Sequence, residues 1–321
     1  MEPHNNKNNN NYENSKMLLS VVVPTYNKAD QIEDLLKSLE TQKIGPWINW
    51  EILIIDNASA ESVTHELNII IEQFNNLPIR FIQNDINIGM AANWNKCFFE
   101  AKGDWVFMVH SDDLVMDGCL NHVLFLIDRI GTIADFIYTG RKSAIYKCNA
   151  NITELTKTRI YERERVKRYD VKDIRFGIMS NAPTGLLCNR NKFILSGGYE
   201  INQHAFALDV DFNIKNLNKF AIYGSTHKCV IKREGDNDTN NSSSDYRISW
   251  INSILDIYER NDIFSNKGFL YRMRVYELVH WASISYKDID LEYHDTLLTK
   301  IGIILYRIAR IIRKFYSFRR I

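Results

Sequence analysis

Two adjacent carboxylates, Asp112 and Asp113, follow directly on an apolar run. That run, DWVFMVH at 104–110, is typical of a buried strand. Two carboxylates at a strand end repel each other and need a counter-charge, which a hard divalent cation that also binds phosphate oxygens would supply. The pair taken alone could equally mark the N-cap of a following helix. The sequence therefore predicts either a metal site or a helix cap here.

Three more polar segments follow apolar runs in the same way. They are PTYN at 24–27, DNAS at 56–59 and NDINIG at 84–89. Open parallel sheets bind ligands beyond the carboxyl ends of their strands, so all four segments should meet along one edge. Asp56 could accept the ring N–H of a pyrimidine, or it could cap the helix that begins near Ser59. Tyr26 could stack on a base or simply pack.

The elements that would position these residues predict an α/β fold. Apolar runs at 18–24, 50–56, 78–83 and 104–110 alternate with amphipathic stretches at 30–40, 61–74 and 91–101. Continuous apolar strands are typical of a parallel sheet covered on both faces. We therefore expect a doubly wound, mixed but mostly parallel sheet. Less regular strands should follow between 135 and 235, at FIYTG, SAIYK, GLLCN and FAIYGS, with a further helix near 205–217.

The chain divides into three parts by composition. Seven of the first fourteen residues are Asn, so residues 1–16 are predicted to be a disordered tail. Residues 17–239 should form the main α/β domain. A polar run after Asp236 leads into a helical C-terminal extension, residues 240–321, with a basic amphipathic end.

Overall charge and cysteine content exclude several classes of function. Forty basic and thirty-nine acidic side chains give a net charge of +1, so no global field favours nucleic acid. Five widely spaced cysteines lack a Cys-x-x-Cys pair and favour a reducing, cytoplasmic environment. No signal peptide and no apolar run of about 18 residues is found, so we expect no membrane-spanning helix.

Four blocks together resemble the N-terminal half of an inverting family-two glycosyltransferase with the GT-A fold, of the bacterial surface polysaccharide type. The blocks are SVVVPTYN, IIDNAS, NDINIG followed by Asn93, and HSDD, spread over residues 18–115. The resemblance implies a nucleotide-sugar donor, with a UDP-sugar favoured by Asp56, and a Mn2+ or Mg2+ cofactor. It also implies inverting transfer to a hydroxyl of a glycan or lipid-linked acceptor.

The resemblance also implies roles for individual residues. Asp113 would ligate the metal, and Asp112 would face the metal and the ribose-diphosphate. The donor site would comprise Pro24, Thr25, Tyr26, Asn27, Asp56, Asn87, Gly89, Asn93, Ser111, Asp112 and Arg233. His110 stands where the family often has a first Asp. Arg233-Glu234-Gly235 stands where many relatives have Arg-x-His, which leaves the third metal ligand open among Glu234, Asp236 and water.

The catalytic base is expected in the second half. Gly197-Gly198-Tyr199-Glu200 and the segment ALDVDF at 207–212 resemble the family's acceptor-side region, where the first acid of a pair acts as base. This maps to Asp209, with Asp211 in reserve. Residues two apart on a helix point in different directions, so both cannot face one hydroxyl. Alternatively, the two acids are first-turn residues favoured by the helix dipole.

Residues 299–321 combine an apolar stripe with positive charge. The stripe is Ile301, Ile304, Leu305, Ile308, Ile311, Ile312 and Phe315, and the segment has seven Lys or Arg and no acid. This pattern predicts an interfacial helix, which would make the enzyme peripheral at the cytoplasmic face of the inner membrane. A helix that closes the core or a dimer contact fits the stripe equally well.

Two other functions compete with a glycosyltransferase. A sugar nucleotidyltransferase has a similar sheet, but it needs a Gly-rich phosphate loop after the first strand, and PTYNKAD contains no glycine. A catalytically silent scaffold or glycan-binding protein with the same fold stays open, because positions 110, 208 and 233–235 depart from the family pattern.

Overall fold

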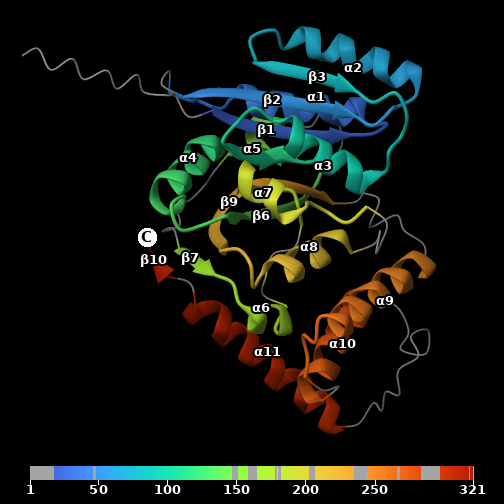
Figure 1. The fold of residues 1–321 in the computed structure, drawn as a ribbon, viewed down its shortest axis with the longest axis vertical. Helices are drawn as coiled ribbons and strands as arrows, with labels where there is room; N and C mark the ends of the chain where they lie inside the picture. Colours follow the sequence, from blue (N-terminus) through green and yellow to red (C-terminus); the bar gives the residue numbers. More distant parts are fainter. Residues whose placement is uncertain are drawn as a thin grey trace, which may run out of the picture.

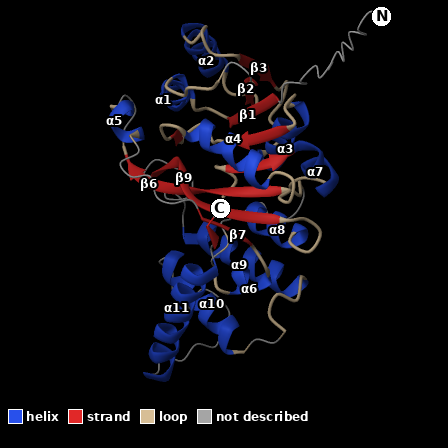
Figure 2. Cartoon of the chain, turned by 90° about the vertical axis from the view of Figure 1, so that its left-hand side faces the viewer, coloured by secondary structure: helices blue, strands red, loops and turns tan. Residues whose placement is uncertain are grey.

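The structure is a computed structural model that describes residues 18–45, 48–146, 151–157, 165–177, 179, 182–201, 207–234, 244–265, 268–282, 297–317 and 319–320. The predicted tail at 1–16 lies outside these residues. Helices cover both faces of one long mixed sheet (Figure 2), and α9, α10 and α11 gather at one end of the molecule (Figure 1). The strand order is β10-β7-β9-β6-β8-β4-β1-β2-β3, with β5 paired to β9.

The first half of the chain builds the parallel part of the sheet. Its elements are β1 (Leu18–Thr25), α1 (Ala29–Glu40), β2 (Asn49–Asp56), α2 (Glu61–Gln73), β3 (Ile79–Gln83), α3 (Met90–Glu100) and β4 (Trp105–Met108). Strands β3, β2, β1 and β4 are all parallel neighbours. The predicted alternation of strands and helices is confirmed in this half.

Strand β1 shows why these strands are apolar throughout. Val22 belongs to the core under α3, whereas Val21 and Val23 belong to the core under α1 and α2. Successive strand residues face opposite sides, and here both sides are covered by helices. All three valines are therefore fully buried.

The second half adds antiparallel strands. Its elements are β5 (Leu114–Val115), α4 (Cys119–Ile130), β6 (Phe136–Ile145), α5 (Ile152–Thr156), β7 (Arg165–Arg168), α6 (Val171–Arg175), β8 (Leu186–Asn189), α7 (Arg190–Ser196), α8 (Leu208–Asn216) and β9 (Ile222–Glu234). Strand β8 is antiparallel to β4 and β6, while β6 and β9 are parallel.

The segments FIYTG and SAIYK, expected as separate strands, form the single strand β6. The register of β6 against β9 shifts at Gly140. A Cβ at Gly140 would lie 2.7 Å from the carbonyl oxygens of Thr226 and His227, so glycine lets the two strands continue past the irregularity.

The C-terminal region shares its core with the main domain. It contains α9 (Ser244–Arg260), α10 (Phe269–Ala282) and α11 (Leu297–Ser317). Ile251 and Ile257 on α9 are fully buried in the same cluster as Phe212 on α8. The region was expected to be helical to its end, but a short strand, β10 (Arg319–Arg320), pairs with β7 instead. None of the described helices is both long enough and apolar enough to cross a bilayer.

Candidate functional site

The ends of the parallel strands meet at one edge of the sheet, as predicted. Thr25 lies opposite Asp56 in the β1–β2 register, and Pro24 lies opposite Ile55. The backbone N–H of Asn57 donates to the carbonyl of Thr25 at 2.9 Å, and the N–H of Asn84 donates to that of Asp56 at 2.9 Å. The polar loops after β1, β2 and β3 therefore share one rim.

In the first loop, Tyr26 and Asn27 are exposed, whereas Thr25 is buried. The exposed fraction of Tyr26 is 46%. The backbone N–H of Asn27 donates to Ser59 Oγ at 2.7 Å, and Asn27 Oδ1 accepts from the backbone N–H of Ala60 at 3.0 Å. Asn27 has the left-handed φ of 54° that Asn tolerates better than most residues. Asn27 thus fastens the first loop to the second.

Asp56 is fully buried and bonded to its own loop. It accepts from the backbone N–H of Ser59 at 3.1 Å, from the Ser59 hydroxyl, and from Thr64 Oγ1 at 3.2 Å. Both carboxylate oxygens therefore stabilise the entry into α2. Asp56 is not the N-cap of α2, because that position is Ala60 and has no side-chain cap hydrogen bond. A contact of Asp56 with a nucleobase stays a prediction.

Four asparagines order the loop between β3 and α3. Asn57 Nδ2 donates to Asn87 Oδ1 at 2.9 Å, and Asn84 Nδ2 donates to Asn93 Oδ1 at 3.1 Å. Asn87 Oδ1 also accepts from the N–H of Gly89 at 2.9 Å. Gly89, with φ 84°, immediately precedes α3. In this structure the predicted donor residues Asn87, Gly89 and Asn93 therefore shape the loop.

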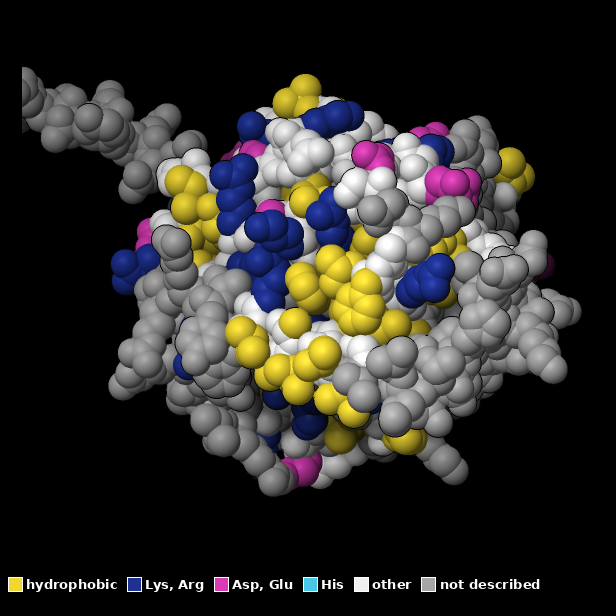
Figure 3. All heavy atoms as spheres, turned by 90° about the horizontal axis from the view of Figure 1, so that it is seen from below, with side chains coloured by type: hydrophobic (Ala, Val, Ile, Leu, Met, Phe, Trp, Pro, Cys, Tyr) yellow, Lys and Arg dark blue, Asp and Glu magenta, His cyan; other side chains and the backbone are white. Residues whose placement is uncertain are grey.

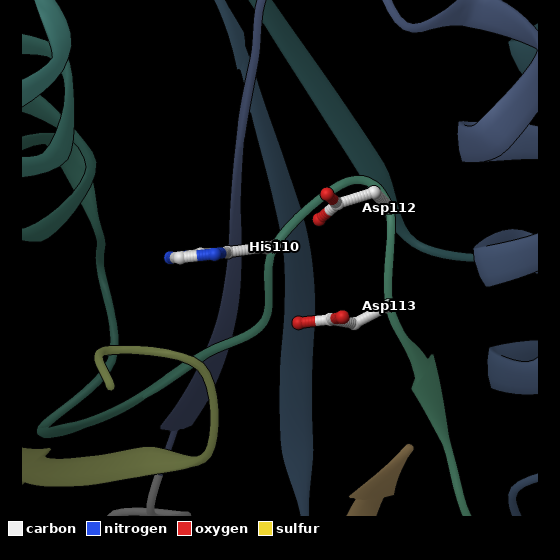
Figure 4. Close-up of side chains that lie close together, drawn as sticks. All are labelled: His110, Asp112 and Asp113. Atoms are coloured by element: carbon white, nitrogen blue, oxygen red, sulfur yellow. The ribbon is translucent and has the colours of Figure 1, made fainter. Parts of the chain in front are cut away.

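His110, Asp112 and Asp113 form a candidate metal group. Each offers one ligand atom, and these atoms lie within 4.8 Å of one another. All three side chains come from one loop, and the two carboxylates point to the same side of it (Figure 4). After buried Ser111 and Asp113 the chain continues into β5, and α4 begins only at Cys119. The N-cap alternative is therefore wrong for this pair.

Burial raises the pKa of Asp113 to about 7, and the Asp112 carboxylate adds to that shift. Hydrogen bonds from Thr184 and from the backbone N–H of Arg233, the latter at 3.1 Å, act in the opposite direction. A carboxylate that is costly to ionise on its own is stabilised in its charged form by a bound cation.

His110 adds a nitrogen to this group. Its ring stacks on Trp94 with the centroids 5.3 Å apart, and its Nε2 is buried without a hydrogen-bond partner in the described part of the chain. Burial lowers the pKa of His110, which favours the neutral imidazole that metals bind. In the sequence, His110 stands out only as the loss of a carboxylate, whereas in the structure it is a potential metal ligand.

Arg233 was predicted to face a diphosphate, but the structure buries it. Its guanidinium pairs with Asp34 at 2.9 Å and lies 4.2 Å from the centre of the Tyr146 ring. Its Nε donates to the backbone carbonyl of Asp112 at 3.1 Å. Only 1% of Arg233 is exposed, so it supports the metal-site loop from the protein interior.

Glu234 and Asp236 were the two residues suggested as a third metal ligand. Half-buried Glu234 accepts from Ser143 Oγ at 2.9 Å and is not part of the metal group among the described residues. Asp236 lies outside the described residues.

Helix α8 carries Asp209 and is fixed against the sheet. Tyr138 OH on β6 donates to Asn213 Oδ1 at 2.6 Å, and Phe212 packs edge-on against Phe136 with centroids 5.5 Å apart. Asp209, in the first turn, is half-buried. Burial raises its pKa to about 6, opposed by the N–H of Val210 and by nearby positive charge.

That positive charge comes from two strand residues that the sequence analysis did not identify. Arg141 on β6 is attracted by both Asp209 and Asp113, and Lys232 on β9 acts on the same two carboxylates. Asp113 and Asp209 therefore interact electrostatically with the same two basic residues. The sequence signal that could have identified them is their position, because Arg141 directly follows the apolar run FIYTG and Lys232 directly follows CVI.

Asp211, the reserve base, faces a different environment. It is buried and forms ion pairs with Lys215 and with Arg260 on α9, each at 2.8 Å. The structure thus separates Asp209 from Asp211 as the helical geometry predicted.

The loop before α8 is tied to α3. The backbone N–H of Tyr199 donates to Asn95 Oδ1, and Asn95 Nδ2 donates to the Tyr199 carbonyl, both at 2.7 Å. A Cβ on Gly198 would lie 2.5 Å from Asn95 Oδ1, which explains the glycine there. Because Trp94 contacts both His110 and Tyr199, α3 connects the two halves of the site.

The α/β sheet carries a candidate metal group beyond its strand ends, and helix α8 carries a half-buried acid, Asp209. The family model of glycosyl transferase family 2 matches residues 20–189, more than half of the chain, and the chain belongs to this family. A glycosyltransferase of Haemophilus influenzae described as uncharacterized is 34% identical over 125 residues. That alignment covers 39% of this chain and only 39% of the relative.

Solved structures share the fold over nearly the whole chain. Staphylococcus aureus TarS 1-349 in complex with UDP-GlcNAc aligns with a TM-score of 0.59 and 19% identity, covering 92% of this chain and 81% of that one. A Pyrobaculum calidifontis mannosyltransferase in complex with GDP-Man and Mn2+ aligns with a TM-score of 0.54 and 13% identity, covering 93% and 87%. The predicted α/β fold of GT-A type is therefore confirmed.

Proposed function

We propose that this protein is a metal-dependent, inverting glycosyltransferase. It would move a sugar from a nucleotide-sugar to a hydroxyl group of a glycan or lipid-linked acceptor. The observation that carries the proposal is the candidate metal group of His110, Asp112 and Asp113, whose Asp113 interacts electrostatically with the same two basic residues, Arg141 and Lys232, as Asp209 does. An inverting transferase needs positive charge on one side of the sugar carbon, to stabilise the leaving group. It needs a base on the other side, to accept the proton of the attacking hydroxyl.

His110, Asp112 and Asp113 would hold the cation. When bound, Mn2+ or Mg2+ would neutralise the charge that develops on the departing nucleoside diphosphate. One imidazole nitrogen with carboxylate oxygens suits Mn2+ better than Mg2+, which prefers oxygen ligands throughout. Arg141 and Lys232 would add positive charge near the same oxygens.

Asp209 would act as the general base. It would accept the proton of the acceptor hydroxyl while that oxygen forms a bond to the anomeric carbon and the bond from this carbon to the diphosphate oxygen breaks. Attack from the face opposite the leaving group inverts the configuration. A pKa of about 6 leaves Asp209 mostly ionised at pH 7 and more basic than an ordinary Asp.

A UDP-sugar is the favoured donor. The TarS structure holds UDP-GlcNAc, which supports a uridine nucleotide, while the mannosyltransferase holds GDP-Man with Mn2+. Exposed Tyr26 could stack on the base. Contact of Asp56 with a pyrimidine would require its bonds to Ser59 and Thr64 to be shared or broken.

Isothermal titration with UDP, with and without Mn2+, tests the proposal. We expect Mn2+ to tighten UDP binding at least about tenfold in the wild type but not in Asp113→Asn. Asp128→Asn, an exposed acid on α4, is the matched control and should behave like the wild type. Nucleotide binding that does not respond to the metal would contradict the proposal.

A hydrolysis assay on a panel of nucleotide-sugars then separates an enzyme from a scaffold. Release of UDP from at least one UDP-sugar, lost in Asp209→Asn, is the expected result. Metal-dependent UDP binding with no turnover of any donor would instead favour the catalytically silent scaffold.

A further inference from the structure

Helix α11 has one face packed against the protein. Ile303 and Tyr306 are 8% and 2% exposed and form a small cluster with Met273. Farther along the helix, Arg310 pairs with Glu277 on α10, and Arg313 pairs with acids of the α6 segment. Positions 303, 306, 310 and 313 follow helical spacing, so they define the inward face.

The opposite face of α11 is apolar and exposed. Ile304, Leu305, Ile308, Ile311 and Ile312 are 47–63% exposed. Phe269 at the start of α10, 54% exposed, extends this surface, because a Cβ on Gly302 would lie 2.8 Å from its ring. Figure 3 shows apolar side chains gathered at this end of the molecule, with Lys and Arg beside them. The side chains of Ile301 and Phe315, predicted on the same stripe, lie outside the described part.

The apolar face is embedded in a strongly positive part of the chain. Helix α9, at the same end of the molecule, contains two Lys or Arg and three Asp or Glu. The segments that pack with α11, together with α11 itself, are 165–177, 268–282 and 297–320, and they contain fourteen Lys or Arg and three Asp or Glu, although the whole chain has a net charge of +1. The three acids are Asp170, Asp173 and Glu277, and each is already paired with Arg310 or Arg313. Exposed Arg307 borders the apolar face.

We propose that α11 and the start of α10 form a surface that binds an anionic lipid bilayer. The apolar face would enter the boundary of headgroups and acyl chains, and the surrounding positive charge would meet anionic headgroups. The helix would lie in the plane of the membrane, since no described helix can span one. This inference stands on surface chemistry alone and does not depend on the proposed glycosyl transfer.

A second copy of the chain is a poorer occupant for this face. A two-fold dimer places the same patch against itself, so two strongly positive surfaces would approach each other. Like charges facing each other across an interface cost binding energy. An anionic bilayer complements both the apolar stripe and the charge, which is why the proposal commits to it.

Co-sedimentation of the full chain with lipid vesicles tests the proposal. Binding should be strong to phosphatidylcholine vesicles that contain phosphatidylglycerol, much weaker without it, and reduced by added salt. The double variant Ile308→Gln, Ile312→Gln should lose about tenfold or more in partitioning. Arg307→Gln should lose about fivefold, the usual effect of one basic residue near an anionic surface.

Matched controls exclude general effects of exposed apolar residues. Ile133→Gln and Leu195→Gln alter side chains that are 57% and 74% exposed elsewhere, and they should bind vesicles like the wild type. All variants should melt like the wild type, because the altered side chains are exposed. Equal binding with and without phosphatidylglycerol would overturn the proposal. So would unchanged binding by the Ile308, Ile312 variant, or a wild-type dimer in sedimentation equilibrium that this variant converts to a monomer.

Discussion

At the residue scale, Asp209 and Asp211 show how one helical turn gives two acids different chemistry. Asp211 has two cations to balance its charge, Lys215 and Arg260. Asp209 lies half-buried toward the sheet edge, where burial raises its pKa and makes it a stronger base. The candidate base is thus the acid of α8 that forms no close ion pair with any of the described residues.

Replacement of Asp209 separates catalysis from donor binding. We expect Asp209→Asn to lower kcat by about 100- to 10,000-fold, the usual contribution of a general base, while UDP and Mn2+ still bind. Asp211→Asn should keep turnover but destabilise the fold by about 1–2 kcal/mol, a moderate loss because Lys215 and Arg260 are partly exposed. Kinetics and thermal melting of both variants check this. If Asp211→Asn is the variant that loses turnover, the assignment of the base is reversed.

The pH profile should report the same carboxylate. A pKa raised to about 6 means that Asp209 becomes protonated as the pH falls through about 6, so kcat should decline there. An ordinary Asp would keep its charge down to about pH 4. The folding linkage has the opposite sign, because a pKa raised in the folded state makes the contribution of Asp209 to stability fall as the pH rises from about 4 to about 6. The measurement is kcat between pH 4.5 and 8, and a flat profile across pH 6 would contradict the prediction.

At the element scale, helix α1 supports the metal-site loop through a buried ion pair. Asp34 on α1 and Arg233 on β9 are each 1% exposed in their side chains, and Arg233 also holds the Asp112 carbonyl and the Asp113 carboxylate. An unpaired charge at such a depth is costly. The pair therefore couples the stability of the sheet to the shape of the loop.

Breaking this pair should affect both stability and metal binding. Asp34→Asn removes the carboxylate that pairs with the buried Arg233 guanidinium, so we expect the free energy of unfolding to fall by about 3–5 kcal/mol and the effect of Mn2+ on UDP binding to weaken. Glu33→Gln is the control on the same helix. It removes a surface pair with Lys37, 2.8 Å in length, and should cost no more than about 0.5 kcal/mol. Chemical denaturation and titration measure the two effects, and equal losses in the two variants would disprove the role of the buried pair.

The elements that could be predicted from sequence are those specified by local pattern. Apolar runs and helical stretches between Leu18 and Met108 carry strong periodicity, so their types and order were confirmed. Strand β6 was missed as one unit because its irregularity at Gly140 depends on pairing with β9, which is remote in sequence. Strand β10 was missed because two residues carry no periodicity and gain strand geometry only from β7.

The residues of the candidate site likewise differ in whether the local sequence or a remote contact determines their place. Asp112, Asp113 and Asp209 could be predicted because each follows a recognisable local segment. Arg141 and Lys232 could not, since their approach to the acids follows from the β6–β9 register. The burial of Arg233 depends on Asp34, about two hundred residues earlier in the chain, so its sequence position alone suggested a ligand contact instead.

At the scale of the whole molecule, residue 240 divides the sequence by composition but does not divide the hydrophobic core. Ile251, Ile254 and Ile257 on α9 are fully or almost fully buried in the cluster that contains Phe212 on α8. Arg260 adds an ion pair from α9 to Asp211. By contrast, α11 contributes a smaller cluster, made with Phe176, Met273 and Tyr276.

Two truncations should therefore behave differently. A chain that ends at residue 239 loses α9 and exposes the apolar surface around Phe212, so we expect it to aggregate or to lack a cooperative melting transition. A chain that ends at residue 296 loses the smaller cluster, the pairing of β10 with β7 and the Arg310 and Arg313 ion pairs, so it should fold with reduced stability. It should also retain Mn2+-dependent UDP binding and lose vesicle binding, because the site lies on the sheet and the proposed lipid surface lies on α11. Melting curves, titration and co-sedimentation on the two proteins test this. A cooperatively folded, UDP-binding chain of 239 residues would show that α9 is dispensable to the core that positions Asp209.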